Sequence, residues 1–132
     1  MKITNSVHHI AITVTDVKRS KEFYMKAADM KLLSEDDKTV GLSDGTFSLW
    51  LKKSRDYIPK VLKFDRNQLG LDHISFSVKD LDDLKKIEKN IKELKAEMED
   101  GGITDDGYGN DDIAIYAKDP DGMKVEFKIN DK

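Results

Sequence analysis

The stretch "HHIAITVTD" (residues 8–16) places two of the chain's three histidines at the head of an alternating, β-branched run. This alternation predicts a strand, and Asp16 behind it is a typical N-cap for a following helix. The same frame, H-I-x-x-x-V-x-D, returns in "DHISFSVKD" (residues 72–80). A pattern that recurs in the second half of a 132-residue chain indicates an internal duplication.

The segments that follow the two strands repeat the same order of elements. Turn signals at Asp44-Gly45 and at "DPDG" (residues 119–122) predict a hairpin in each half, and Gly101-Gly102 is expected to end the second helix. Each half therefore reads β-α-β-β, with room for one more strand. The expected helix and hairpin strands lie at residues 17–30, 38–44 and 45–53, and at 81–99, 111–119 and 122–129.

Chain length predicts a single domain, because a half of about 60 residues buries too little surface to fold comfortably alone. We place module one at about 1–53, the connection at about 54–70 and module two at about 71–132. The 23 basic and 26 acidic side chains are mixed along the sequence, so we expect no nucleic-acid partner. No run is apolar enough for a membrane span, no signal peptide is recognisable, and no cysteine is present. We expect a cytoplasmic protein without a membrane partner.

Side-chain alternation places three metal-binding residue types on the strand faces that point away from the helices. His9 lies opposite Ile10, Ile12 and Val14, His73 occupies the equivalent position of the repeat, and Glu126 lies opposite Val125 and Phe127. Two imidazoles and one carboxylate can form a facial triad for one divalent ion, with Fe, Mn, Ni and Zn all suitable. A strand histidine is, however, more often a hydrogen-bonded structural residue, and a lone glutamate is more often solvated.

Three motifs, in this order along the chain, resemble those of a known family. The motifs are H-I-A-I-x-V-x-D-x-x-x-S-x-x-F-Y (9–24), D-H-I-S-F-S-V-x-D (72–80) and D-P-D-G-x-K-V-E-F (119–127). Together they resemble the vicinal oxygen chelate superfamily of glyoxalase I, bleomycin-resistance proteins, extradiol dioxygenases and fosfomycin-resistance enzymes. The resemblance implies an α+β fold, with two tandem βαβββ modules forming a cupped, mostly antiparallel sheet around a metal site, in a homodimer. It also implies that His9, His73 and Glu126 hold the ion.

The departures from the family pattern bear on the reaction. Glyoxalase I-like members take a fourth ligand from the last strand of module one, where this chain has Trp50, and an indole cannot coordinate a metal. We expect Trp50 to bind substrate as an apolar wall.

Tyr116 matches the tyrosine of extradiol dioxygenases, so we expect it to bind substrate and to act with Glu126 in catalysis. His8 alone remains for the further acid/base histidine of those enzymes. Fosfomycin-resistance-like transferases also use three ligands, but their potassium- and phosphonate-binding cluster has no match here.

Two functions remain open at this stage. The first is a small metal-dependent enzyme, whether lyase, isomerase or dioxygenase, whose ion chelates oxygen atoms of a small-molecule substrate. The alternative is a non-catalytic protein of the bleomycin-resistance type that sequesters an aromatic or cationic ligand. Trp50, Tyr108, Tyr116 and the acidic stretch 105–112 would suit such a ligand. A third possibility is an ion bound only for stability.

Overall fold

The duplication seen in the sequence is present in the fold. The computed structural model describes residues 3–55, 63–105 and 113–129. It contains two compact units, Met1–Leu62 and Lys63–Lys132. The elements of the first are β1 (His9–Val14), α1 (Val17–Ala27), β2 (Lys31–Glu35), β3 (Thr39–Ser43) and β4 (Ser48–Lys53). Those of the second are β5 (His73–Val78), α2 (Leu81–Glu93), the short 3₁₀ helix η1 (Glu99–Gly101), β6 (Thr104–Asp105), β7 (Ile113–Lys118) and β8 (Lys124–Ile129).

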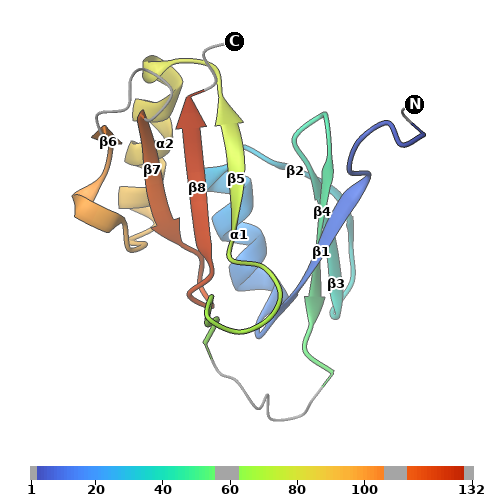
Figure 1. The fold of residues 1–132 in the computed structure, drawn as a ribbon. Coiled ribbons are helices and arrows are strands. Elements are labelled where there is room, and N and C mark those ends of the chain that lie inside the picture. The colour runs from blue at the N-terminus through green and yellow to red at the C-terminus, as the bar shows by residue number, and fades with distance from the viewer. Residues whose placement is uncertain (1–2, 56–62, 106–112, 130–132) are drawn as a thin grey trace. The chain divides into compact units, whose positions relative to one another are not determined.

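Each unit has one four-stranded mixed sheet with the same strand order. The orders are β1-β4-β3-β2 and β5-β8-β7-β6, and the strands of each sheet can be followed in Figure 1. The first strand of each unit runs parallel to the last, and the other neighbours are antiparallel. The expected α+β fold with two tandem βαβββ modules is thus confirmed. The expected division of one domain into modules and connection stays a prediction.

The first unit packs α1 on the apolar face of its sheet. Asp16 caps the helix as predicted, because its carboxylate accepts hydrogen bonds from the backbone N–H groups of Lys18 and Arg19. The helix lies against β3 and β4. The core residues of the unit are Ile12, Val14, Val17, Phe23, Tyr24, Ala27, Met30, Val40, Leu42, Leu49 and Leu51. The helix ends at Ala27, earlier than predicted, and the left-handed backbone of Asp29 (φ 51°) redirects the chain while Met30 stays buried.

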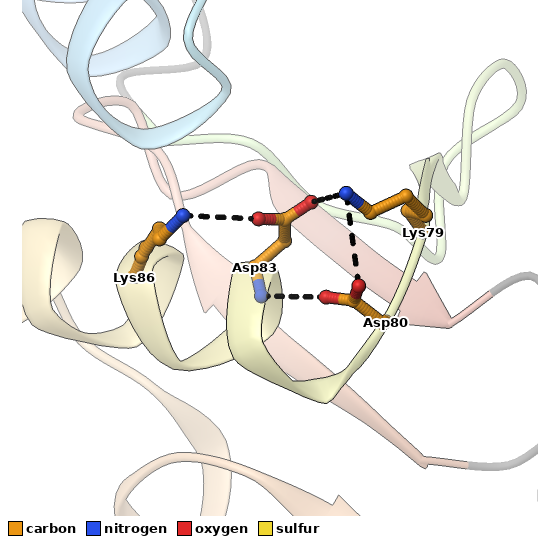
Figure 2. Close-up of polar contacts among 4 residues, drawn as sticks. All are labelled: Lys79, Asp80, Asp83 and Lys86. Atoms are coloured by element: carbon orange, nitrogen blue, oxygen red, sulfur yellow. Dashed lines mark hydrogen bonds and ion pairs between the residues drawn. The ribbon is translucent and has the colours of Figure 1, made fainter.

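The second unit begins its helix with an equivalent cap. The Asp80 carboxylate accepts a hydrogen bond from the backbone N–H of Asp83 at 2.9 Å. Figure 2 shows that Lys79 reaches Asp80 and Asp83, at 3.7 and 3.4 Å, while Lys86 reaches the other Asp83 oxygen at 3.3 Å. The hydrogen bond from Lys86 is the main reason why the pKa of Asp83 lies below its ordinary value. Attraction to Asp83 raises the pKa of Lys79.

The predicted extent of the second helix, 81–99, was wrong at its C-terminal end. The helix ends at Glu93, and Lys95 then adopts a left-handed conformation (φ 58°). Met98, which has helical spacing in the sequence, instead forms an isolated β-bridge with Ala117. Leu84 and Ile91 are the fully buried helix residues, whereas Leu81 is 41% exposed. The Gly101-Gly102 pair therefore ends η1, as its last residue and its C-cap, and does not end α2.

The two predicted hairpin turns are confirmed. At "DPDG", the carboxylate of buried Asp119 accepts hydrogen bonds from the backbone N–H groups of Asp121 and Met123, and Gly122 has a φ of 87°. This turn sets the register of β7 against β8, and with it the position of Glu126. No helix among the described residues is both long and apolar enough to cross a membrane.

Candidate metal centre

Two of the three predicted ligands are adjacent in the second unit. Nε2 of His73, on β5, lies 3.5 Å from Oε1 of Glu126, on the neighbouring strand β8. Glu126 is 7% exposed and, together with Asp119, is one of two buried polar residues in the described part of the unit. A buried carboxylate requires a compensating partner, because removing its charge from water is costly. The imidazole of His73 is the polar group that the structure places beside it, and a cation held between the two would supply the compensating charge.

Asp72 contacts the opposite nitrogen of the same ring. Its Oδ1 atom lies 2.7 Å from Nδ1 of His73. This hydrogen bond is the main cause that lowers the pKa of Asp72, so the group is a carboxylate at neutral pH and can only accept. Nδ1 of His73 therefore donates, and Nε2 of a neutral ring presents its lone pair toward Glu126. The D-H-I motif contains this pair, but strand alternation predicts no role for Asp72 because it precedes the strand.

The geometry of the His73–Glu126 pair fits a shared divalent ion. Its 3.5 Å separation exceeds the usual 2.7–3.2 Å of an N–H···O hydrogen bond. Two ligand atoms bonded to one ion at about 2.0–2.2 Å lie about 3 Å apart at an angle of 90° and about 3.5 Å apart at the 109–120° angles of four- and five-coordinate sites, close to the separation observed. Nitrogen and carboxylate oxygen are both ordinary ligands of Fe, Mn, Ni and Zn. An imidazolium–carboxylate ion pair is the other arrangement that satisfies these two groups.

His9 occupies the corresponding place in the first unit. It begins β1, and its side chain lies on the strand face opposite buried Ile12 and Val14. Nδ1 of His9 lies 2.8 Å from Nδ1 of His8. Within each unit, the described residues hold no group of three histidine, aspartate or glutamate side chains able to enclose a metal. The structure therefore brings His73 and Glu126 together, and the contribution of His9 to the same ion stays a prediction.

Strand register identifies the residues of the first unit that are equivalent to Glu126 and Tyr116. In the second unit Glu126 pairs with Ser75 on β5 and with Tyr116 on β7. In the first unit the corresponding central residue is Trp50, which pairs with Ala11 on β1 and Gly41 on β3. Trp50 thus occupies the place from which a fourth ligand would come, and Gly41 occupies that of Tyr116.

The Trp50 ring fills the space that a side chain at position 41 would need. A Cβ atom built on Gly41 would lie 2.6, 2.7 and 2.9 Å from three carbons of the indole. Trp50 is half-buried, and it lies on the same face of the sheet as His9 because both alternate with buried neighbours. An aromatic surface therefore stands on the His9 face of the first unit, and its contact with a substrate stays a prediction.

Tyr116 lies beside Glu126 on the equivalent face of the second unit. The two residues are direct partners across the antiparallel β7–β8 pair, so their side chains point to the same side. The ammonium group of Lys124 lies 4.5 Å from the centroid of the Tyr116 ring, a favourable cation–π distance. Lys124 also lies 3.5 Å from Glu99. The position of Tyr116 is compatible with the predicted substrate contact.

A pocket that the sequence did not predict opens at the β7–β8 turn of the second unit. It has a volume of about 360 Å³, and Arg66, Lys118, Lys124 and Glu99 contribute to its lining. Lys118 forms an ion pair with Glu97 at 2.8 Å, and Lys124 forms one with Glu99. Because acidic partners already accompany both lysines, the pocket carries little unbalanced positive charge. Its charge alone does not define a ligand.

Comparison with known proteins identifies the family. The sequence model of the Glyoxalase/Bleomycin resistance protein/Dioxygenase superfamily matches residues 6–127. The chain belongs to this superfamily. The match spans both modules and includes His9, His73 and Glu126. The resemblance inferred from the three motifs is confirmed.

Individual relatives agree with this assignment. The chain is 30% identical over 122 residues to the metallothiol transferase FosB of Lysinibacillus sphaericus (strain C3-41), covering 92% of this chain and 80% of that protein. Its structure is similar to a glyoxylase/bleomycin resistance protein/dioxygenase domain from Frankia sp. EAN1pec, with 25% identity, a TM-score of 0.77 and coverage of 98% and 94%. The fold is also that of the fosfomycin resistance protein FosX from Listeria monocytogenes, at 16% identity, TM-score 0.75 and coverage of 97% and 95%.

Proposed function

We propose that this chain is a metal-dependent enzyme that binds one divalent ion through His9, His73 and Glu126. The observation that carries the proposal is the 3.5 Å separation between Nε2 of His73 and Oε1 of the buried Glu126 carboxylate. Asp72 on the far side of the ring makes Nε2 the nitrogen that is free to coordinate. His9 joins the set because it opens the equivalent strand of the other module, with Nδ1 likewise engaged by its neighbour.

The chain's own residues define what a substrate would meet. A divalent ion, when bound, supplies Lewis-acid stabilisation to two adjacent oxygen atoms of a small-molecule substrate. Trp50 in the fourth-ligand position leaves three protein ligands, so substrate or water would complete the coordination. The indole provides an apolar wall, and the Tyr116 hydroxyl donates a hydrogen bond to a substrate oxygen. Glu126 would count as catalytic because its carboxylate would hold the ion that the substrate oxygens would meet.

Among the reactions of the superfamily, we favour the addition of a thiol to a small molecule. The relative at 30% identity is named a metallothiol transferase, and a three-ligand site agrees with the pattern of that group. A four-ligand isomerase is disfavoured by Trp50. A dioxygenase would need His8 as its acid/base group, and Nδ1 of His8 is already in contact with Nδ1 of His9.

The sequestering alternative has one observation in its favour. The half-exposed Trp50 ring offers a stacking surface for an aromatic ligand. At Tyr116, however, the protein's own Lys124 lies over the ring, so a cationic ligand would have to displace it. Tyr108 and residues 106–112 of the acidic stretch lie outside the described residues. The metal-dependent enzyme is therefore the function that the site supports best.

Thiol consumption provides a direct test of the proposed reaction. Protein purified without a histidine tag is loaded in turn with Fe²⁺, Mn²⁺, Ni²⁺ and Zn²⁺, and then mixed with fosfomycin and L-cysteine or glutathione. We expect thiol loss that requires a metal, disappears in His73→Ala and persists in Asp82→Ala, a control that removes one exposed charge from α2. Metal binding without turnover of these substrates, or of the glutathione–methylglyoxal adduct used to detect a lyase, would reject the proposed reaction, and absence of a bound metal after loading would favour the sequestering protein.

A further inference from the structure

Two of the candidate ligands are histidines, and in each case the preceding residue contacts Nδ1 of the histidine ring. In the second unit the contact runs from Asp72 to His73 at 2.7 Å, and in the first from His8 to His9 at 2.8 Å. The two pairs occupy equivalent positions, because His9 and His73 each begin the first strand of their unit. Both units thus have an Nδ1 partner at this position, an imidazole in the first and a carboxylate in the second.

The chemistry of the partner decides how firmly the histidine tautomer is fixed. A neutral imidazole carries one ring proton, and only the nitrogen without it can bind a metal. An ionised carboxylate accepts hydrogen bonds and donates none, so Asp72 requires the proton of His73 to lie on Nδ1. The lone pair of Nε2 is then directed toward Glu126, 3.5 Å away. Asp72 therefore selects the tautomer that a metal ligand needs.

We propose that Asp72 is a positioning residue that holds His73 in the Nδ1–H tautomer and thereby increases the affinity of the site for its metal. This inference rests on the proposed metal-binding function. Partners on the second nitrogen of a metal-bound histidine typically change metal affinity by about 10- to 100-fold when they are removed. Asp72 would influence the ion only by orienting His73 and would not contact the ion itself, so it is not a catalytic residue.

His8 controls the tautomer of His9 less strictly than Asp72 controls that of His73. Nδ1 of a neutral His8 ring accepts a hydrogen bond from Nδ1 of His9 only when the His8 proton lies on Nε2. In the other tautomer, Nδ1 of His8 donates the hydrogen bond to Nδ1 of His9. The first unit therefore leaves the tautomer of His9 less strictly determined. Replacing His8 should reduce metal affinity by a smaller factor than replacing Asp72.

A purely structural role for Asp72 can be separated from a positioning role. The Asp72 side chain is 59% exposed, so its removal opens no cavity in the core. Asp82 offers a matched control, because it is also exposed and lies on α2, which packs on the other face of the same sheet. Asp82→Ala changes the net charge as Asp72→Ala does, without touching His73.

The experiment compares wild type, Asp72→Ala, Asp72→Asn and Asp82→Ala by two measurements. Long-range ¹H–¹⁵N NMR on the metal-free proteins reports which nitrogen of His73 carries the proton. Titration with Mn²⁺ or Zn²⁺ then gives the metal affinity of each variant. We expect Asp72→Ala to shift His73 toward the Nε2–H form and to lose about 10- to 100-fold in affinity. Asp72→Asn should fall between it and wild type because the amide oxygen still accepts, and Asp82→Ala should match wild type.

Two results would overturn the inference while leaving the metal site intact. One is an unchanged tautomer of His73 in Asp72→Ala, and the other is a metal affinity of that variant equal to that of Asp82→Ala. If the wild-type chain binds neither metal, the proposed function fails, and the role of Asp72 in metal affinity fails with it. The NMR comparison then shows separately whether Asp72 still sets the tautomer.

Discussion

Replacing Gly41 by alanine should displace the Trp50 ring from β3 and lower the free energy of unfolding. The new methyl group would lie 2.6 Å from the nearest indole carbon, well inside contact distance. Overpacking of this kind costs about 1–3 kcal/mol. Because the φ of Gly41 is not positive, an alanine fits the backbone there, and the reduced entropy of the unfolded chain offsets about 0.4–1 kcal/mol. The expected net loss is about 1 kcal/mol.

A double-mutant cycle makes the expectation sharper, since the sign of the effect should reverse. In a Trp50→Ala background no ring opposes the methyl group, so Gly41→Ala should stabilise the protein by about 0.4–1 kcal/mol. Denaturant titration measures all four proteins. Trp50 is the single tryptophan of the chain, so its fluorescence emission reports the displacement directly, and we expect a red shift in Gly41→Ala. Stabilisation in both backgrounds, with unchanged emission, would refute the contact between Trp50 and Gly41.

Three further predictions concern separate parts of the molecule. Trp50→Glu should raise the affinity for a divalent metal, because a carboxylate then occupies the position of the fourth ligand in four-ligand relatives. A titration with Mn²⁺ that shows no gain would mean that position 50 is not equivalent to the fourth-ligand position. Asp80→Ala should lower the free energy of unfolding by about 1 kcal/mol through loss of the α2 cap, as measured by denaturant titration. An unchanged free energy of unfolding would mean that the cap does not stabilise the protein. Lys86→Ala should raise the pKa of Asp83 toward its ordinary value, as followed by carboxyl-carbon NMR. Since the folded-state pKa of Asp83 is lowered, its carboxylate stabilises the fold above the unfolded pKa, and this contribution disappears as the pH falls through the folded value.

The sequence predicted those elements whose burial follows a simple period. The strands "HIAITV" and "HISFSV" were placed correctly because one face of each is buried and the other exposed. The additional strand β2 was expected but not located, because all five of its residues are exposed and no alternation marks it. The end of α2 was misplaced because Leu94 and Met98 continue the helical spacing, although the chain has already turned at Lys95.

The candidate site could be predicted only as far as residue identity and side-chain direction allow. Alternation placed His73 and Glu126 on one face of their sheet, and the structure brings them to 3.5 Å. The hydrogen bond from His73 to Asp72 depends on side-chain conformation before the strand begins, which periodicity does not describe. The packing of Trp50 over Gly41 depends on the register of β3 against β4, which follows from the intervening turn and not from either strand alone.

Metal stoichiometry tests the central claim most directly. The tag-free chain, purified, stripped and reloaded with Fe²⁺, Mn²⁺, Ni²⁺ or Zn²⁺, is examined by elemental analysis together with His9→Ala, His73→Ala and Asp82→Ala. We predict about one ion per chain in wild type and in Asp82→Ala, as one three-ligand site requires, and marked loss in both histidine variants. Absence of a bound ion from the reloaded wild type, or full occupancy in His73→Ala, would contradict the account.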